Sequence, residues 1–455
     1  MTTSPFLLGA FAPVFRETTA LTFPVTGRIP PDLNGLFTQI GPNPIRPPRH
    51  TDTDRYQWFA QDGMVSGVRL QEGTAQWFRN RWVRSTRVTR ALGESRTPGR
   101  RHFPIGTVHT NVVSHAGLLL ALVETGCTAV QLTPELDTVR YTDVNGTLPH
   151  GASAHPKFDP VTGELHAVVY SPLRTFAEYR VLDRAGALLS SRRVDLGGRP
   201  MLHDIALTKT HVVLFDLPVR FQIGPAVIGR FPYQWDEHYQ ARVGILPRQG
   251  DGGVRWFPIE PCFLFHTVGA TETATHLTVK GIRYRRLFDS GAADPLTQAG
   301  QLWQWNINLV TGSVIEGQLD DLLQELPRIN PDHITSGARY HYAITAGSDH
   351  ISSHSPQSLL KYDHRTGQGL IRPEAPHTVP TEAVYVPRPG PPTGSSESQD
   401  DGWVLHFSYD EQRQASDLVI IDAQNFTGEP AAVIHLPVKV PFGFHSSWIA
   451  DTDLR

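Results

Sequence analysis

The stretch GASAHPKFDPVTGE, residues 151–164, contains a turn motif that recurs along the chain and a histidine just before it. Asp159 and Gly163 flank a short spacer. An aspartate side chain can accept backbone N–H bonds and glycine tolerates a positive φ, so the motif predicts a β-hairpin corner. Related segments are INLVTG (Ile307 to Gly312), YDHRTG (Tyr362 to Gly367), IDAQNFTG (Ile421 to Gly428) and the looser LDRAG (Leu182 to Gly186).

The spacing of these turns favours a β-propeller. Gly367 follows Gly312 by 55 residues, and Gly428 follows Gly367 by 61. A period of about 60 residues fits one four-stranded blade with its loops. The 455 residues then correspond to about seven blades. Such turns occur in any all-β protein, so a pair of β-sandwiches is the alternative. We expect residues 1–455 to form one all-β, seven-bladed propeller domain.

Short apolar segments dominate the rest of the sequence, and convincing helical periodicity is scarce. Runs rich in Val, Ile, Leu and aromatic residues, separated by turns, predict strands. The best helical candidate is the short segment Leu319 to Glu325. The predicted strands include Leu118 to Glu124, Leu165 to Ser171, His211 to Pro218, His276 to Tyr284 and Asp417 to Asp422.

Composition excludes several classes of function. Lys and Arg number 41 against 44 acidic residues, which gives no basic face for nucleic acid. Cys127 and Cys262 are the only two cysteines; they could pair, but a reducing compartment is the better interpretation. The N-terminus lacks a basic signal-peptide region, and no apolar run is long enough to span a membrane. We therefore expect a cytoplasmic monomer.

Four of the 21 histidines lie at or within apolar runs, where a charged imidazolium is costly. Successive separations are 48, 63 and 179 residues, the last close to three blades. Residues that recur once per blade can all point to the propeller axis. The spacing predicts an axial metal site made by His155, His203, His266 and His445.

The donor set narrows the choice of metal without fixing it. Imidazole suits Fe, Cu, Zn and Ni, and a closed tetrahedral zinc site leaves no position for chemistry. Four histidines with two open positions suit a six-coordinate Fe(II) that binds O₂.

The sequence resembles the carotenoid cleavage oxygenases over nearly the whole chain. The motifs that carry the resemblance are AHPKFDP, LHDIALT, FHTVGATE and GFH around the four histidines, together with DLNGLFTQIGPNP near the N-terminus and ELPRINP. The resemblance implies a seven-bladed propeller with a non-haem Fe(II) on its axis and a loop and helix cap that forms an apolar tunnel. It also implies that Glu124, Glu325 and Glu382 support three of the histidines, His203, His266 and His445, while His155 lacks such a partner. Glu272 matches a further family position to which we assign no role.

Departures from the family motifs include Gly269 and Thr271 after the third histidine, Ser446 after the fourth, and the early segment FAQDGMVS (residues 59–66). None replaces a histidine. They leave the tunnel lining, and so the substrate, open.

The implied reaction is O₂-dependent cleavage of a C=C bond into two carbonyl products. The substrate is either a carotenoid or apocarotenoid, or else a phenolic stilbene or phenylpropene. Stilbene-cleaving relatives often have Lys directly before the first supporting glutamate, where this chain has Val123, so we favour an apolar polyene. A non-catalytic binding propeller is a third, more distant interpretation that predicts no metal.

The apolar stretch from Phe221 to Trp235 includes Arg230 and Tyr233 among Ile, Val and Phe residues. Such a mixture suits the interface between lipid and water. Two interpretations remain open: a peripheral membrane contact, or an ordinary loop packed on the propeller.

Overall fold

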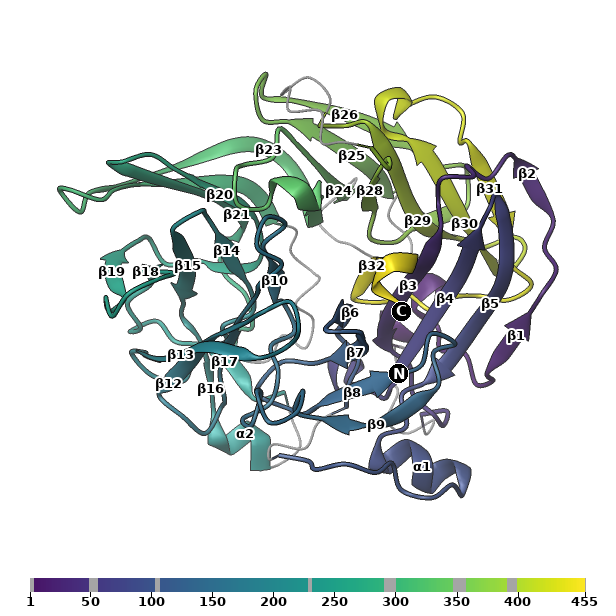
Figure 1. Cartoon of the computed structure of the whole chain (residues 1–455), viewed down its shortest axis with the longest axis horizontal. Helices are drawn as coiled ribbons and strands as arrows, with labels where there is room; N and C mark the ends of the chain where they lie inside the picture. The colour runs from purple at the N-terminus through teal and green to yellow at the C-terminus, as the bar shows by residue number, and fades with distance from the viewer. Residues whose placement is uncertain are drawn as a thin grey trace.

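The computed structural model describes residues 4–48, 56–102, 107–227, 231–289, 300–346, 357–390 and 399–454. The described chain is nearly all β, with short 3₁₀ turns and two α-helices, α1 (Thr86–Leu92) and α2 (Ile223–Val227). Figure 1 shows the strands as blades arranged in a ring around a central axis. The prediction of an all-β, seven-bladed propeller is confirmed.

Each blade is an antiparallel sheet, and one strand at the edge of that sheet lies nearest the axis. The first three blades are β3 (Gly35–Pro42), β4 (Gly63–Gln71) and β5 (Thr74–Trp82), flanked by β1 (Thr18–Ala20) and β32 (His445–Ala450); β6 (Asn111–His115), β7 (Leu118–Leu122), β8 (Ala129–Leu132) and β9 (Thr138–Thr142); and β10 (Lys157–Phe158), β11 (Leu165–Val169), β12 (Phe176–Leu182) and β13 (Leu188–Asp195).

The fourth blade is followed by one sheet of seven strands that carries the fifth and sixth blades. The fourth blade consists of β14 (Ile205–Leu207), β15 (His211–Asp216), β18 (Arg242–Pro247) and β19 (Arg255–Pro258). The seven-stranded sheet consists of β20 (Phe263–Glu272), β21 (His276–Tyr284), β22 (Gly300–Asn308), β23 (Val314–Ile329), β24 (Tyr340–Ala346), β25 (Gln357–Asp363) and β26 (Gln368–Pro373).

The last blade holds β27 (Thr378–Pro380), β28 (Val384–Pro387), β29 (Gly402–Asp410), β30 (Ala415–Asp422), β31 (Ala432–His435) and the N-terminal β2 (Val25–Gly27). β16 (Val219–Phe221) precedes α2, and β17 (Tyr233–Trp235) follows it. These two strands pair with each other in a separate antiparallel ribbon.

The helix predicted over Leu319 to Glu325 is wrong, because this segment is the middle of the long strand β23. Its first part pairs with β22, Trp303 opposite Gln318, and its last part pairs with β24, Glu325 opposite Ile344. Seven residues are too few to hold a helix by local propensity, so pairing on both sides decides the conformation. β23 thereby links two blades.

The repeated turns form the predicted hairpin corners. Gly163, Gly312 and Gly367 have φ angles of 73°, 79° and 70°, and Oδ1 of Asp159 accepts from the backbone N–H groups of Val161 and Thr162. Gly186 in the looser copy also has positive φ. The copy that ends at Gly428 differs, because a 3₁₀ turn (Ala423–Asn425), capped by the Asp422 side chain, replaces the positive-φ glycine.

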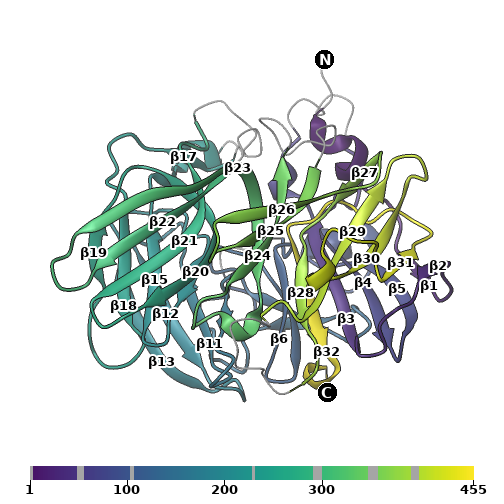
Figure 2. The ribbon, with the colours of Figure 1, turned by 90° about the horizontal axis from the view of Figure 1, so that it is seen from above.

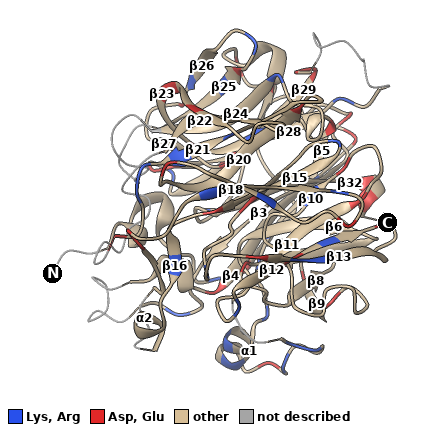
Figure 3. Ribbon diagram, turned by 90° about the vertical axis from the view of Figure 1, so that its left-hand side faces the viewer, with Lys and Arg blue, Asp and Glu red and all other residues tan. Residues whose placement is uncertain are grey.

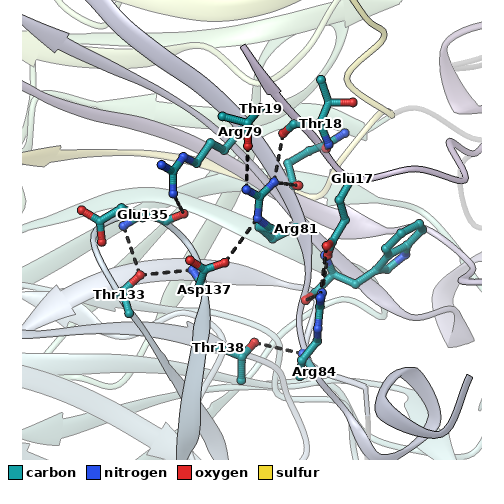
Figure 4. Close-up of polar contacts among 12 residues, drawn as sticks. Glu17, Thr18, Thr19, Arg79, Arg81, Arg84, Thr133, Glu135, Asp137 and Thr138 are labelled. Carbon is teal, nitrogen blue, oxygen red and sulfur yellow. Dashed lines mark hydrogen bonds and ion pairs between the residues drawn. The ribbon is translucent and has the colours of Figure 1, made fainter. Parts of the chain in front are cut away.

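The two ends of the chain close the ring. β32 pairs with β3, placing His445 opposite Ile40, and β2 pairs with β31. Figure 4 shows how charged contacts hold the N-terminal segment: Glu17 pairs with Arg84, and Arg81 reaches Asp137 in the next blade at 3.3 Å. Figure 2 places the chain ends at opposite faces of the ring.

Aromatic residues gather where the N-terminal turns meet the propeller, as expected for a cap. Phe6 stacks on Trp58 with ring centroids 5.0 Å apart, and Phe11 lies 4.5 Å from Phe442. Phe6, Phe11 and Trp58 are all buried. Burial of such large rings is worth about 1.5–3 kcal/mol each, so these contacts fix the N-terminal segment over this face.

Three further features of the described residues bear on the sequence interpretation. Both cysteines are buried thiols, and burial raises the pKa of Cys262 to about 12. In the described ranges no helix has the length and apolar character needed to cross a bilayer. On the side drawn in Figure 3, basic and acidic positions are scattered along the ribbon, and the basic ones do not gather in one region.

Candidate metal centre

The four predicted histidines lie at the inner strands of four blades. His445 begins β32, and His266 lies within β20. His155 precedes β10 by two residues, and His203 precedes β14 by two. Because these strands line the axis in Figure 1, the fold brings together side chains that are up to 290 residues apart in sequence.

The imidazoles converge on one point. One ring nitrogen from each of the four histidines lies within 4.8 Å of the others, and the Nε2 atoms of His203 and His266 are 3.3 Å apart. Metal–nitrogen bonds of about 2.0–2.1 Å at right angles place two ligand atoms about 3 Å apart, so this spacing fits two ligands of one ion. Nε2 of His155 is buried and has no hydrogen-bond partner among the described residues.

Three glutamates hold the outer nitrogens of three of these rings. Nδ1 of His203 lies 2.6 Å from Glu124. Nδ1 of His266 lies 2.7 Å from Glu325. The contact pattern matches the arrangement of carboxylate, histidine and metal that fixes the tautomer and leaves Nε2 for the ion.

The fourth histidine is held by Glu382, whose Oε1 lies 2.9 Å from Nδ1 of His445. No carboxylate is recorded against His155 within the described ranges. Each blade therefore supplies one residue: a histidine from four blades and a glutamate from the other three.

The second oxygen of each glutamate also has a donor, which the sequence did not reveal. Tyr170 donates its hydroxyl to Glu124 at 2.5 Å, and Tyr284 donates to Glu325 at 2.7 Å. The backbone N–H of Ser446 donates to Glu382. The tyrosines follow or end ordinary apolar strands, so only the folded arrangement identifies them.

Burial and pairing together set the charge states. Burial opposes charge on Glu325 and His266, but their mutual attraction outweighs it: the pKa of Glu325 lies below its usual range and that of His266 above it. Burial, and then the neighbouring His203, hold the pKa of His155 well below its ordinary value. Four imidazole nitrogens beside ionised carboxylates form a donor set that fits a divalent transition metal.

A cavity of about 1020 Å³ along the propeller axis reaches His155 from the face that carries the C-terminus. Inner strands of several blades line it, including residues near Lys157, Thr267 and Ser447. Phe444, which precedes His445, contacts Trp58 of the cap with ring centroids 4.8 Å apart. Phe265, which precedes His266, lies 5.0 Å from the ring of His203.

The departures from the family motifs leave the four histidines in place. Ser446 is fully buried and its hydroxyl lies 3.5 Å from Oε1 of Gln39. Gly269 lines the axial cavity, where an added Cβ would meet only Ile329, at 3.7 Å. Thr271 is exposed at the outer end of β20.

Glu272 does not join the metal centre. Its carboxylate lies 2.8 Å from Nδ1 of His211 and accepts from Thr208 and Thr210. It therefore ties β20 to the hairpin between β14 and β15, which is a structural contact between blades.

A second group of potential ligands, Asp159, Glu164 and His166, is occupied by a cation of the protein itself. A guanidinium nitrogen of Arg248 lies 2.5 Å from Asp159, 3.1 Å from Glu164 and 2.9 Å from His166. The guanidinium neutralises the carboxylates, so this group is an ion network between blades.

Buried neutral histidines predict a loss of stability in mild acid. Burial lowers the pKa of His166 to about 3 and that of His109 to about 4, whereas unfolded histidine has a pKa of about 6.5. As the pH falls below about 6.5 only the unfolded state gains these protons, so each such histidine costs about 1.4 kcal/mol per pH unit until its folded pKa is reached. Urea unfolding between pH 7.5 and 4.5 measures this slope. We expect His166→Gln to flatten it and the exposed His238→Gln to leave it unchanged; equal slopes in all three proteins contradict the prediction.

Comparisons with known proteins give one consistent result. The family model described as retinal pigment epithelial membrane protein matches residues 11–450. The carotenoid cleavage oxygenase of Mycobacterium tuberculosis is 38% identical, with 99% of this chain and 98% of the relative covered. The resveratrol cleavage oxygenase 1 of Aspergillus fumigatus is 30% identical, with 94% and 92% covered.

A solved structure has the same architecture. Cobalt-substituted apocarotenoid oxygenase of Synechocystis superposes with a TM-score of 0.83 at 25% identity, covering 96% of this chain and 97% of the other. The similarity of sequence and fold extends over the whole ring, and the four-histidine group fits the non-haem metal site of such enzymes. The chain belongs to the carotenoid cleavage oxygenase family and is a dioxygenase.

Proposed function

We propose that the protein is an Fe(II)-dependent dioxygenase that cleaves a C=C bond of a carotenoid or apocarotenoid with O₂ and releases two carbonyl products. The carrying observation is the buried group of four imidazoles, three of them anchored by glutamates. His155, His203, His266 and His445 would hold the iron through ring nitrogens. Bound Fe(II) would supply the activation of O₂, which carbon–carbon cleavage requires.

The protein contributes position and charge rather than an acid or base. Glu124, Glu325 and Glu382 orient the imidazoles and offset the charge of a cation held by four neutral ligands. These carboxylates stay ionised because each pairs with a histidine and accepts a second donor. No side chain is required to move a proton.

The substrate class is supported by an arc of aromatic rings between two of the proposed ligands. Phe444, next to His445, stacks on Phe59, with centroids 5.3 Å apart. The arc continues through Phe231, Phe288 and Phe265, which lies 5.0 Å from the ring of His203. Phe59, Phe231 and Phe444 are partly exposed, whereas Phe265 and Phe288 are buried. An aromatic surface of this kind suits a long conjugated polyene.

Cleavage of a phenolic stilbene is the alternative, favoured by the resveratrol cleavage oxygenase among the relatives. Val123 bears on this choice. It lies just beyond β7, is 9% exposed and packs in an apolar cluster with Ile40, Val108 and Cys127. A phenol oxygen brought to this cluster would find no partner in Val123, which disfavours a hydroxystilbene by about 1–3 kcal/mol.

We predict that the wild type prefers an apocarotenal to resveratrol by at least about tenfold in kcat/KM, equivalent to about 1.4 kcal/mol. Val123→Lys should shift this ratio toward resveratrol, because its ammonium can meet a phenol oxygen, and Val123→Met controls for the change in side-chain size. A competition assay with both substrates measures the ratio. A wild type that favours resveratrol tenfold would replace the proposed substrate by the alternative.

The central experiment measures iron and products together. Protein purified with added Fe(II) should hold about one iron per chain, and mass spectrometry should detect two carbonyl products from at least one member of a carotenoid, apocarotenoid and stilbene panel. Absence of bound metal would instead favour the non-catalytic binding propeller.

We also propose that this protein, acting as a monomer in the cytoplasm, touches membranes at α2. Ile223 and Val227 lie one helical turn apart and are 59% and 78% exposed, and no residue of α2 is buried. Residues 228–230 of the apolar stretch lie outside the described residues.

Val227→Asp should lower co-sedimentation with phosphatidylcholine liposomes several-fold, since it places a charge in the apolar contact. Val310→Asp, at an exposed valine in the β22–β23 turn, is the matched control and should leave binding unchanged. Negligible sedimentation of the wild type would remove the proposed contact.

A further inference from the structure

Three of the ligand-bearing segments are joined by a side-chain network directly behind the histidines. Asp204 follows His203, Thr267 follows His266, and Lys157 lies two residues after His155. Oδ1 of Asp204 lies 2.7 Å from Nζ of Lys157. Oδ2 of Asp204 accepts from the backbone N–H and the hydroxyl of Thr267, at 2.9 and 2.8 Å.

These side-chain contacts connect strands that share no backbone hydrogen bonds. β10, β14 and β20 belong to three different sheets. The side chain of Asp204 is 2% exposed, and that of Lys157, which lines the axial cavity, is 19% exposed. One buried carboxylate thus links three blades at the level of the metal centre.

Among the described residues, every recorded partner of the Asp204 carboxylate is a donor. Besides Lys157 and Thr267, the backbone N–H of Ile205 donates to Oδ1 at 2.7 Å. An ionised carboxylate satisfies all of these donors, whereas an amide would turn an N–H donor toward one set of them. The site therefore requires a carboxylate rather than a side chain of its shape alone.

We propose that Asp204 is a positioning residue that sets the relative placement of His155, His203 and His266, with Lys157 and Thr267 as its partners. The inference rests on the proposed metal centre. The three outer glutamates fix the tilt of individual rings, whereas Asp204 fixes the distance between the segments that carry them. Loss of this link loosens the ligand geometry without removing a ligand.

The chain offers a matched control for a structural role. Asp400 and Lys361 form another buried Asp–Lys pair, with Oδ2 and Nζ 2.7 Å apart, which connects β25 with the segment before β29. It also spans two sheets but contacts none of the four histidines. A general effect of breaking a buried ion pair between blades would appear equally in both pairs.

The test is metal titration of the apoprotein, followed with Co(II) by its visible absorption and with Fe(II) by anaerobic equilibrium dialysis. Asp204→Asn should weaken binding about 10- to 100-fold, as for other groups that orient ligands, and should change the Co(II) spectrum. Asp400→Asn should change the metal affinity by less than about twofold and leave the Co(II) spectrum unchanged. It should lower the unfolding midpoint about as much as Asp204→Asn does. Equal metal affinities and spectra in wild type and Asp204→Asn would overturn the proposal.

Milder variants keep the test decisive if Asp204→Asn does not fold. Thr267→Val removes one hydroxyl and Lys157→Met removes the ammonium; both should weaken metal binding, and Thr267→Ser and Lys157→Arg should restore it. Unchanged binding in Thr267→Val and Lys157→Met would also overturn the proposal. A wild type that binds neither metal contradicts the proposed function itself, which separates that failure from failure of this inference.

Discussion

His203→Ala is expected to abolish cleavage and to reduce bound iron from about one per chain to a small fraction. The change removes one of four converging imidazoles. It also leaves the Glu124 carboxylate, whose side chain is 18% exposed, without its histidine and with the Tyr170 hydroxyl as its remaining donor among the described residues. Loss of the partner of a largely desolvated carboxylate is destabilising, so the site should bind metal more weakly and the blade should be less stable.

The measurements are iron per chain, turnover of an apocarotenal, and the thermal unfolding midpoint. His211→Ala is the matched control, because His211 also pairs with a glutamate, Glu272, but lies outside the four-histidine group. We expect His211→Ala to lower stability while keeping iron and turnover near wild type. Full iron occupancy with normal turnover in His203→Ala would refute the ligand assignment.

The sequence could predict the periodic part of this structure. Short turns such as that from Asp159 to Gly163 are determined by local residues, namely an aspartate side chain that accepts backbone N–H bonds and a glycine with positive φ. The spacing of these turns along the sequence indicates the length of a blade. The four histidines could be singled out because each lies at the start of an apolar run or within one. Their convergence then follows from one inner strand per blade.

Features that depend on tertiary pairing could not be predicted in the same way. The segment from Leu319 to Glu325 has a weak helical pattern, but neighbours on both edges hold it as a strand. Tyr170, Tyr284 and Asp204 look like ordinary strand or turn residues in the sequence. Their roles arise from partners 41 to 63 residues away, which only the ring brings near.

Glu325→Gln should weaken metal binding about 10- to 100-fold and lower turnover without unfolding the protein. The Glu325 carboxylate accepts from His266 Nδ1 and the Tyr284 hydroxyl, both at 2.7 Å, and also from the backbone N–H of Leu326. A glutamine keeps one acceptor oxygen but turns an N–H group toward one of these donors. Either His266 loses its support or Tyr284 loses its acceptor.

Loss of the carboxylate also removes a negative charge that offsets the bound cation, so affinity should fall even where the ring stays in place. Glu382→Gln should act in the same direction through His445. The matched control is Glu272→Gln, which breaks an equivalent contact with His211 away from the metal. Anaerobic Fe(II) titration and steady-state kinetics of the three variants decide the point: similar small losses in all three would make Glu325 and Glu382 structural residues like Glu272, whereas a selective loss of affinity in the first two would assign them to the metal centre.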